Sequence, residues 1–235
     1  MNFDLSVIND NWSYLLFGRT ADGEIGGLLL TLLMSLSAGL LALIFGIFTA
    51  VISWRFQGWT RRVLYSGAEF IRSIPLILVI FWLYFLLPRF LGRNISGVTT
   101  VILSIAWFSA ASVMHATLSG IEALSFGQVE AGLASGMSYW QVLRHILLPQ
   151  AVPNLIPSYI GLFVALIKDT SLALVVNVPE LTTVANQVNS RTQIYPAEIF
   201  LFIGVIYFVI CTVLSELPRL LVKRTHQHLK FANSI

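Results

Sequence analysis

The chain has 235 residues, of which 57% are apolar and only 11% are charged, and its formal net charge at pH 7 is +3. Soluble domains carry about 25% charged residues, so this composition excludes an ordinary soluble protein and predicts an all-α integral membrane protein. The small positive excess does not call for a nucleic-acid partner, because membrane topology and lipid headgroups account for where the basic residues lie.

Five stretches without charged side chains are long enough, or nearly so, to cross a hydrocarbon core, which takes about 20 residues. In chain order they cover residues 25–54, 73–88, 94–121, 145–167 and 199–215. The second and fifth are short, so the charged residues that flank them are expected to mark the membrane interfaces. We predict five transmembrane helices within a membrane domain of residues 25–220.

Basic residues between the spans predict the orientation, because cytoplasmic loops are richer in Lys and Arg. One side receives nine of them: Arg55, Arg61, Arg62, Arg72, Arg144, Arg219, Lys223, Arg224 and Lys230. The other side receives Arg19, Arg89, Arg93 and Arg191, and the acidic Asp4, Asp10, Asp22 and Glu24. We therefore expect segment 1–24 outside, in the periplasm, and a basic tail, 221–235, in the cytoplasm. The first apolar run is too long for a cleaved signal peptide.

A cytoplasmic insertion of about 30 residues, centred on segment 122–150, separates the third and fourth spans. Ser125 with Gln128, and Ser138 with Gln141, each fit a capping box at a helix start. Two short helices are therefore predicted in this segment.

The turn and the end of this helix pair are also marked in the sequence. Gly136 lies where a helix C-terminus commonly takes a left-handed residue, and Pro149 and Pro153 are expected to end the second helix before the fourth span. Trp140 and Leu143 begin an apolar stripe along the second helix. The pattern alone allows this pair to lie on the membrane surface or to dock on a partner protein.

The same segment resembles the conserved cytoplasmic loop of permeases of ATP-binding-cassette (ABC) importers, which reads Glu-Ala-Ala, three residues, Gly, nine residues, Ile, one residue, Leu-Pro. The residues at those spacings here are Glu130, Ala131, Gly132, Gly136, Ile146, Leu148 and Pro149, with Gly132 in place of the second Ala. In that family the loop forms coupling helices that sit in a groove of a cytoplasmic ATPase. The resemblance thus implies an ATPase partner for the helix pair.

Other segments resemble the polar amino-acid uptake subfamily, whose members include glutamate/aspartate permeases and general L-amino-acid permeases. They are residues 26–32, 72–76 and 168–172, together with Gly127 and Gln128 before the loop motif. The resemblance implies a transport subunit of the bacterial inner membrane that is not an enzyme. Its implied partners are an ATPase dimer that binds ATP and Mg, a second permease subunit, identical or paralogous, and a periplasmic amino-acid-binding protein.

One segment departs from that subfamily. The family usually carries Ala-Glu-Ile, one residue, Arg-Gly on the third helix, where this chain has His115 and Leu118 in place of the Glu and the Arg. Loss of both partners avoids leaving one charge buried and unpaired. His115 is a candidate substrate contact or a packed polar residue, and substrate specificity cannot be carried over through this segment.

Two adjacent charges fall in the fourth span, at a depth where charge is costly. Lys168 and Asp169 are followed by Thr170 and Ser171, and the apolar pattern is then interrupted up to Glu180. A helix that breaks here must line a cavity or be buried in protein, and a cation beside freed backbone donors suits a zwitterion. We predict these four residues at the translocation path, with a polar clamp between helices as the alternative.

Two other classes of function were weighed. An ion- or proton-coupled carrier could use His115, Lys168, Asp169 and Glu180 as a relay, although five helices leave no room for an internal inverted repeat. An intramembrane enzyme or a metal site is not expected, because the four histidines are dispersed and Cys211 is the single cysteine. The chain has no Gly-rich phosphate loop with Lys-Ser/Thr, so no cofactor is expected on it.

Overall fold

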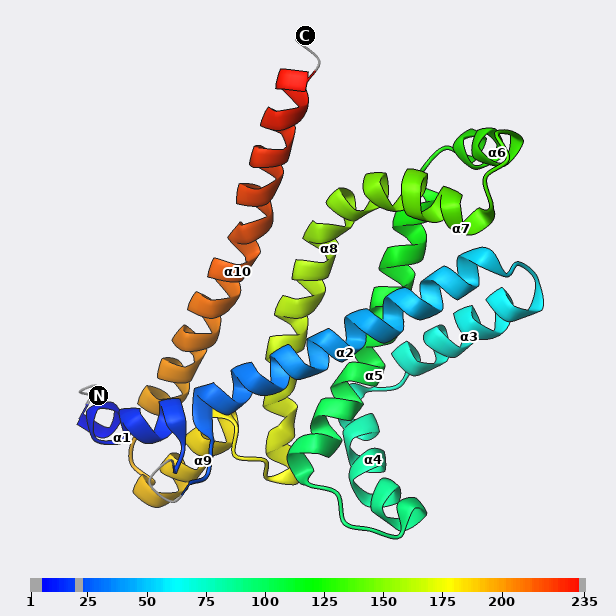
Figure 1. The fold of residues 1–235 in the computed structure, drawn as a ribbon. Coiled ribbons are helices and arrows are strands. Elements are labelled where there is room, and N and C mark those ends of the chain that lie inside the picture. The colour runs from blue at the N-terminus through cyan, green and yellow to red at the C-terminus, as the bar shows by residue number, and fades with distance from the viewer. Residues whose placement is uncertain (1–5, 20–22, 233–235) are drawn as a thin grey trace.

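The computed structural model describes the backbone of residues 6–19 and 23–232 and the side chains up to residue 217. Every named element in these ranges is helical, as predicted (Figure 1). Asp4 and Asp22 lie outside the described residues, as do the side chains of Arg219, Lys223, Arg224 and Lys230. The elements are α1 (Ser6–Phe17), α2 (Gly27–Arg55), α3 (Trp59–Ser73), α4 (Leu76–Leu91), α5 (Gly97–Glu122), α6 (Phe126–Ala134), α7 (Tyr139–Val142), the π-helical turn η2 (Leu143–Leu147), α8 (Leu148–Asp169), the 3₁₀ segment η3 (Thr170–Val176), α9 (Leu181–Thr192) and α10 (Pro196–Ala232).

Within residues 6–19 and 23–232, four helical stretches are long and apolar enough to span a membrane: Gly27–Arg55, Gly97–Glu122, Tyr139–Val176 and Pro196–Leu217. They coincide with four of the five predicted runs. The remaining run is not one straight helix, because α3 and α4 meet at an angle of 98° and qualify as a span only together. The 16 residues of α4 rise about 24 Å at 1.5 Å per residue, which is short of a hydrocarbon core of about 30 Å.

The bend between α3 and α4 follows from a single proline. Ile74 precedes Pro75 and adopts an extended backbone, with φ −93° and ψ 133°, as the proline ring requires of the residue before it. Pro75 then caps α4 at φ −57°. The apolar runs place the residues between the first two spans outside the membrane and predict no helix there; residues 59–73 form the amphipathic helix α3.

Small side chains set the distance between α2 and α5, which form the centre of the bundle. A Cβ atom added to Gly46 would lie 2.7 Å from the Ala110 carbonyl oxygen and 2.5 Å from Val113 Cβ. Ala38, Ala42 and Ala50 of α2 are also buried. Close approach through small residues is typical of helix pairs in lipid, where dispersion and not water exclusion holds them together.

The two ends of the bundle carry different elements. α6 and α7 lie together at one end, which we call the hairpin end, whereas α1 and α9 lie at the other, the α9 end (Figure 1). α10 projects from the bundle and leaves large apolar side chains exposed, Phe208 and Val213 among them. A membrane or a further chain must cover this face, because exposed apolar area on this scale marks an interface.

Candidate functional site

The predicted turn of the helix pair is present at the hairpin end. Gly136 adopts a left-handed φ of 84°, and its N–H donates to the Leu133 carbonyl at 3.0 Å. The capping box predicted for the second helix is complete. The Gln141 N–H donates to Ser138 Oγ at 3.3 Å and the Ser138 N–H donates to Gln141 Oε1 at 2.7 Å.

Two expectations about this segment were wrong. The Ser125 hydroxyl caps no helix, since the Gln128 backbone N–H donates to the Ser125 carbonyl at 3.1 Å. The Gln128 side chain turns to Gln150, with which it exchanges hydrogen bonds of 3.2 and 2.9 Å. Pro149 and Pro153 do not stop the second helix, since α7 continues through η2 into α8. Pro149 falls in the first turn of α8, directly after η2.

Packing explains the glycine that departs from the family pattern. A Cβ atom on Gly132 would lie 2.8 Å from Val142 Cγ2 and 3.1 Å from Ile146 Cδ1. Gly132 is buried here, whereas Glu130 and Ala131 are exposed on the same short helix. The motif therefore divides into residues that join α6 to the next helical turn and residues that face outward.

The end of α2 holds the helix pair through rings and a guanidinium, which the sequence did not predict. The Arg55 guanidinium lies 4.5 Å from the Tyr139 ring centre and 5.1 Å from that of Phe56. The Trp54 and Tyr139 rings meet edge to face at 6.4 Å. These residues, with Glu130, line a cavity of about 870 Å³ between the end of α2 and α6.

A second link at this end is an ion pair. Arg61 at the start of α3 pairs with Glu122 at the end of α5, with 2.6 Å between Nη1 and Oε1. Both side chains are about one-third exposed, so water screens much of their attraction. The pair ties the start of α3 to the point where α5 leads into the helix pair.

The predicted helix break is present at the far end of α8. Lys168 is exposed, Asp169 is half-buried and Thr170 is buried. The Thr170 and Ser171 hydroxyls donate to the carbonyls of Ile167 and Lys168, at 2.6 and 2.7 Å. The chain then tightens into η3 and ends in a left-handed residue, Asn177, at φ 54°. Among the described residues, neither Lys168 nor Asp169 forms an ion pair.

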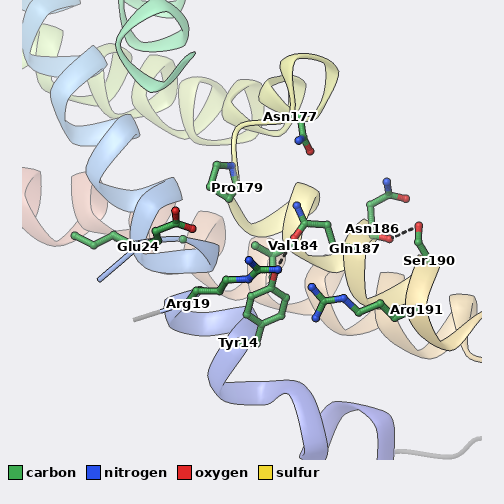
Figure 2. Close-up of a pocket in the computed structure, with 13 residues that line it drawn as sticks. Tyr14, Arg19, Glu24, Asn177, Pro179, Val184, Asn186, Gln187, Ser190 and Arg191 are labelled. Carbon is green, nitrogen blue, oxygen red and sulfur yellow. Dashed lines mark hydrogen bonds between the residues drawn. The ribbon is translucent and has the colours of Figure 1, made fainter. Parts of the chain in front are cut away.

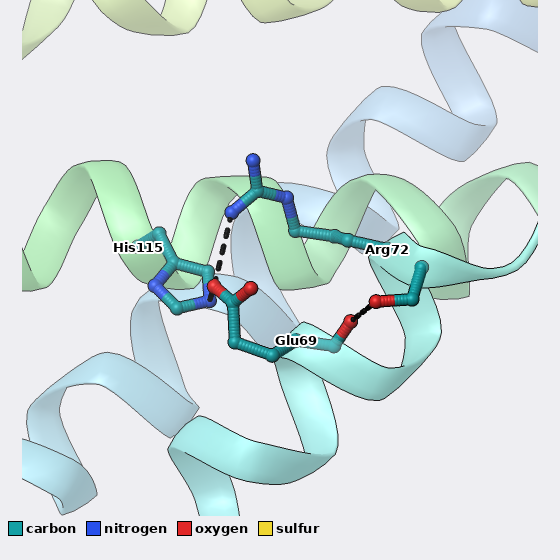
Figure 3. A network of polar contacts seen from close by, with 4 residues as sticks. Glu69, Arg72 and His115 are labelled. Carbon is teal, nitrogen blue, oxygen red and sulfur yellow. Dashed lines mark hydrogen bonds and ion pairs between the residues drawn. The ribbon is translucent and has the colours of Figure 1, made fainter.

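His115 lies elsewhere, against α3 (Figure 3). Its Nε2 atom is 3.0 Å from Glu69 Oε1, without the geometry of a hydrogen bond, and its ring meets Tyr65 edge to face at 4.6 Å. Arg72 pairs with the same Glu69 oxygen at 3.3 Å. Whereas Lys168 and Asp169 close α8 at the α9 end, His115 lies toward the hairpin end of α5. The structure does not bring these candidates together.

Glu180, considered above as a relay member, is fully buried as the cap of α9. Its carboxylate accepts the N–H groups of Thr182 and Thr183, at 3.0 and 2.8 Å, and the Tyr207 hydroxyl at 3.3 Å. Burial raises the pKa of this carboxyl, while the bonds from Thr182, Thr183 and Tyr207 oppose the rise. Thr31 of α2 donates to it at 3.4 Å, so one side chain joins α2, α9 and α10.

A second cavity, of about 750 Å³, opens at the α9 end between α1, α9 and the segment before α2. Figure 2 shows Arg19 and Arg191 beside the Tyr14 ring, with Gln187 above it. The Tyr14 hydroxyl donates to Gln187 Oε1 at 2.5 Å. Nothing in the sequence pattern had singled out these residues together, because α1 and α9 were not predicted as helices.

Comparison with known proteins identifies the family of this chain. Residues 42–227 match the family model of the binding-protein-dependent transport system inner membrane component. The chain belongs to this family. As a binding-protein-dependent transport component, it is a multi-pass inner-membrane protein and a transport subunit, not an enzyme, as the sequence predicted.

Two relatives of this transport component are matched over most of their own length. This chain is 32% identical over 195 residues to the probable glutamine ABC transporter permease protein GlnP of Bacillus subtilis, and the match covers 82% of this chain and 89% of the relative. It is 31% identical over 236 residues, 95% and 98% of the two chains, to the glutamate/aspartate import permease protein GltK of Escherichia coli.

Solved structures share the fold. A crystal structure of an amino acid ABC transporter with histidines superposes with a TM-score of 0.81 at 28% identity, covering 95% of this chain and all of that one. The MetNI methionine ABC transporter, in an inward-facing form, gives 0.73 at 19% identity over 83% and 92% of the two chains. The second likeness concerns the fold alone.

Proposed function

We propose that this chain is the permease subunit of an ABC importer that carries a polar amino acid, of the glutamate, aspartate or glutamine class, into the cytoplasm. The observation that carries the proposal is that Glu130 and Ala131 are exposed on α6, while Gly132 of the same motif packs against Val142 and Ile146. Relatives named for glutamine and for glutamate/aspartate, each matched over more than four-fifths of this chain, support the substrate class.

The orientation follows from the positive-inside rule. Arg55, Arg61, Arg62 and Arg144 are all at or near the hairpin end, so that end is cytoplasmic and the α9 end faces the periplasm. α6 and α7 then act as coupling helices that dock on an ATPase dimer, which binds ATP and Mg. Their contact and shaping residues are Gln128, Glu130, Ala131, Gly132, Gly136, Ile146, Leu148 and Pro149.

The translocation path runs beside the break at the end of α8. Lys168 is exposed on the single chain, and a charge within a span must face water or protein. A second permease, identical or paralogous, supplies the facing wall, and the path accepts substrate from a periplasmic binding protein. Asp169, Thr170 and Ser171 lie on the same side of the path as Lys168, whereas His115 lies toward the inner end of the path.

Transport by the reconstituted complex tests the proposal. Vesicles holding the permease, its ATPase and its binding protein should take up radiolabelled glutamate, aspartate or glutamine only with ATP. Glu130→Ala should leave ATP hydrolysis and ligand capture by the binding protein in place while uptake falls. Arg62→Ala, an exposed change on α3, is the matched control. Uptake that persists without the ATPase would establish an ion-coupled carrier instead.

A further inference from the structure

The cavity at the α9 end has a polar wall built from two distant parts of the chain. Tyr14, Arg19 and Glu24 come from the amino-terminal segment, and Gln187 and Arg191 come from α9 (Figure 2). Under the proposed orientation this cavity opens to the periplasm. Folding alone thus brings two guanidinium groups to one outer surface.

Both guanidinium groups keep their hydrogen-bonding edges available. The Arg191 guanidinium carbon lies 5.2 Å from the centre of the Tyr14 ring, which is a cation–π contact. Within the described ranges no carboxylate forms an ion pair with Arg19 or Arg191. Such a fork matches a carboxylate with two parallel hydrogen bonds.

The wall behind these groups is fixed before any partner arrives. The Tyr14 hydroxyl bonds Gln187, and the far side of α9 is buried in an apolar cluster that includes Leu15, Val188 and Ile199. The Glu180 cap sets where α9 begins. Preorganised donors cost less to order on binding than mobile ones.

We propose that this cavity is a docking site for an acidic side chain of the periplasmic binding protein, a proposal that rests on the importer function proposed above. Arg19 and Arg191 are exposed, as expected at the polar rim of a protein interface. A site for a free amino acid would bury most of the ligand instead. Among the described residues that line the cavity, two arginines stand against the one carboxylate of Glu24, and this positive lining complements an acidic surface.

The test uses the whole complex in lipid nanodiscs, titrated with the binding protein loaded with its amino acid. ATP hydrolysis is measured at low and high salt. Changing Arg19→Ala and Arg191→Ala together should raise the half-saturating concentration of the binding protein on the order of tenfold at low salt and remove most of its salt dependence. Hydrolysis without binding protein should not change.

Arg93→Ala is the matched control, since Arg93 is an exposed arginine on the same proposed side but outside the cavity. Arg191→Glu gives a second arm: a Lys replacing one acidic residue of the binding protein should restore its stimulation. If the half-saturating concentration of the binding protein is unchanged in the double variant, the docking site is overturned. It is also overturned if the free amino acid alone stimulates ATP hydrolysis and this stimulation is lost in the double variant. If even the wild-type complex ignores the binding protein, the importer function itself fails.

Discussion

The two ends of the molecule are held by different physics. At the α9 end, one buried carboxylate accepts directional hydrogen bonds from three helices. At the hairpin end, the short helices are held by apolar packing and ring contacts, and by polar contacts that water reaches, namely the Gln128–Gln150 hydrogen bonds and the Arg61–Glu122 ion pair. Buried hydrogen-bond networks have one good geometry, whereas apolar and ring contacts tolerate small shifts. We infer that the α9 end is the fixed part and that the hairpin end is the part able to follow a moving ATPase.

The largest effect is expected from Glu180→Ala, which removes the centre of the fixed end. The change leaves the N–H groups of Thr182 and Thr183 buried without their acceptor, and each such loss costs about 1–3 kcal/mol. We expect thermal unfolding of the purified permease in detergent at a markedly lower Tm. A matched change at the exposed Glu24 should leave Tm unaltered. A normal Tm in the Glu180 variant would remove the proposed contrast between the ends.

A smaller effect is expected from Gly132→Ala, which restores the usual family residue. Its Cβ would meet Val142 Cγ2 at 2.8 Å, and overpacking of this kind costs about 1–3 kcal/mol. ATP-driven uptake should fall because α6 is pushed away from α7. Adding Val142→Ala makes room and should recover uptake. If the double variant is no better than the single one, the clash does not explain the glycine.

Arg55→Ala should act on coupling more than on stability. Arg55 is half-buried, and a cation over a ring contributes between about 0.5–1 kcal/mol at exposed sites and about 2 kcal/mol when desolvated, so Tm should fall less than in the Glu180 variant. Because the guanidinium joins α2 to Tyr139 at the start of α7, we expect less substrate taken up per ATP hydrolysed. Arg55→Lys keeps the charge but loses the planar stack and should fall between the two. If the wild type and both Arg55 variants take up the same amount of substrate per ATP hydrolysed, Arg55 has no role in coupling.

The smallest effect is expected at the Arg61–Glu122 pair. Partly exposed ion pairs contribute at most about 1 kcal/mol. A double-mutant cycle with Arg61→Ala and Glu122→Ala, read by Tm, should give a coupling energy in that range that shrinks in high salt. A large coupling that is insensitive to salt would mean that the hairpin end is held as rigidly as the other end.

Sequence patterns predicted the elements that depend on one local rule. The apolar runs gave the long spans, Gly136 gave the left-handed turn, and Ser138 with Gln141 gave the cap. Errors arose where a distant residue decided the outcome. Gln128 turned to Gln150 instead of to Ser125, and Glu180 became a buried cap because Thr31 and Tyr207 donate to it from other helices.

The short polar helices were also missed for a physical reason. α3 and α9 are amphipathic or polar, so the apolar runs did not predict them as helices. The cavity between α1 and α9 could not be predicted, because its walls are more than 150 residues apart along the chain. The motif gave candidate residues for coupling, but only the packing around Gly132 showed which of them face outward.

The π-helical turn η2 affects the direction in which side chains further along the same helix point. It lies in a helical stretch of 38 residues, from Tyr139 to Val176, which joins the hairpin to the charged pair at the end of α8. A π turn corresponds to one residue inserted into an α-helix, and one residue is worth about 100° of rotation. Deleting a single residue from η2 would therefore turn Lys168 and Asp169 to another face of the bundle while leaving both ends of the stretch intact.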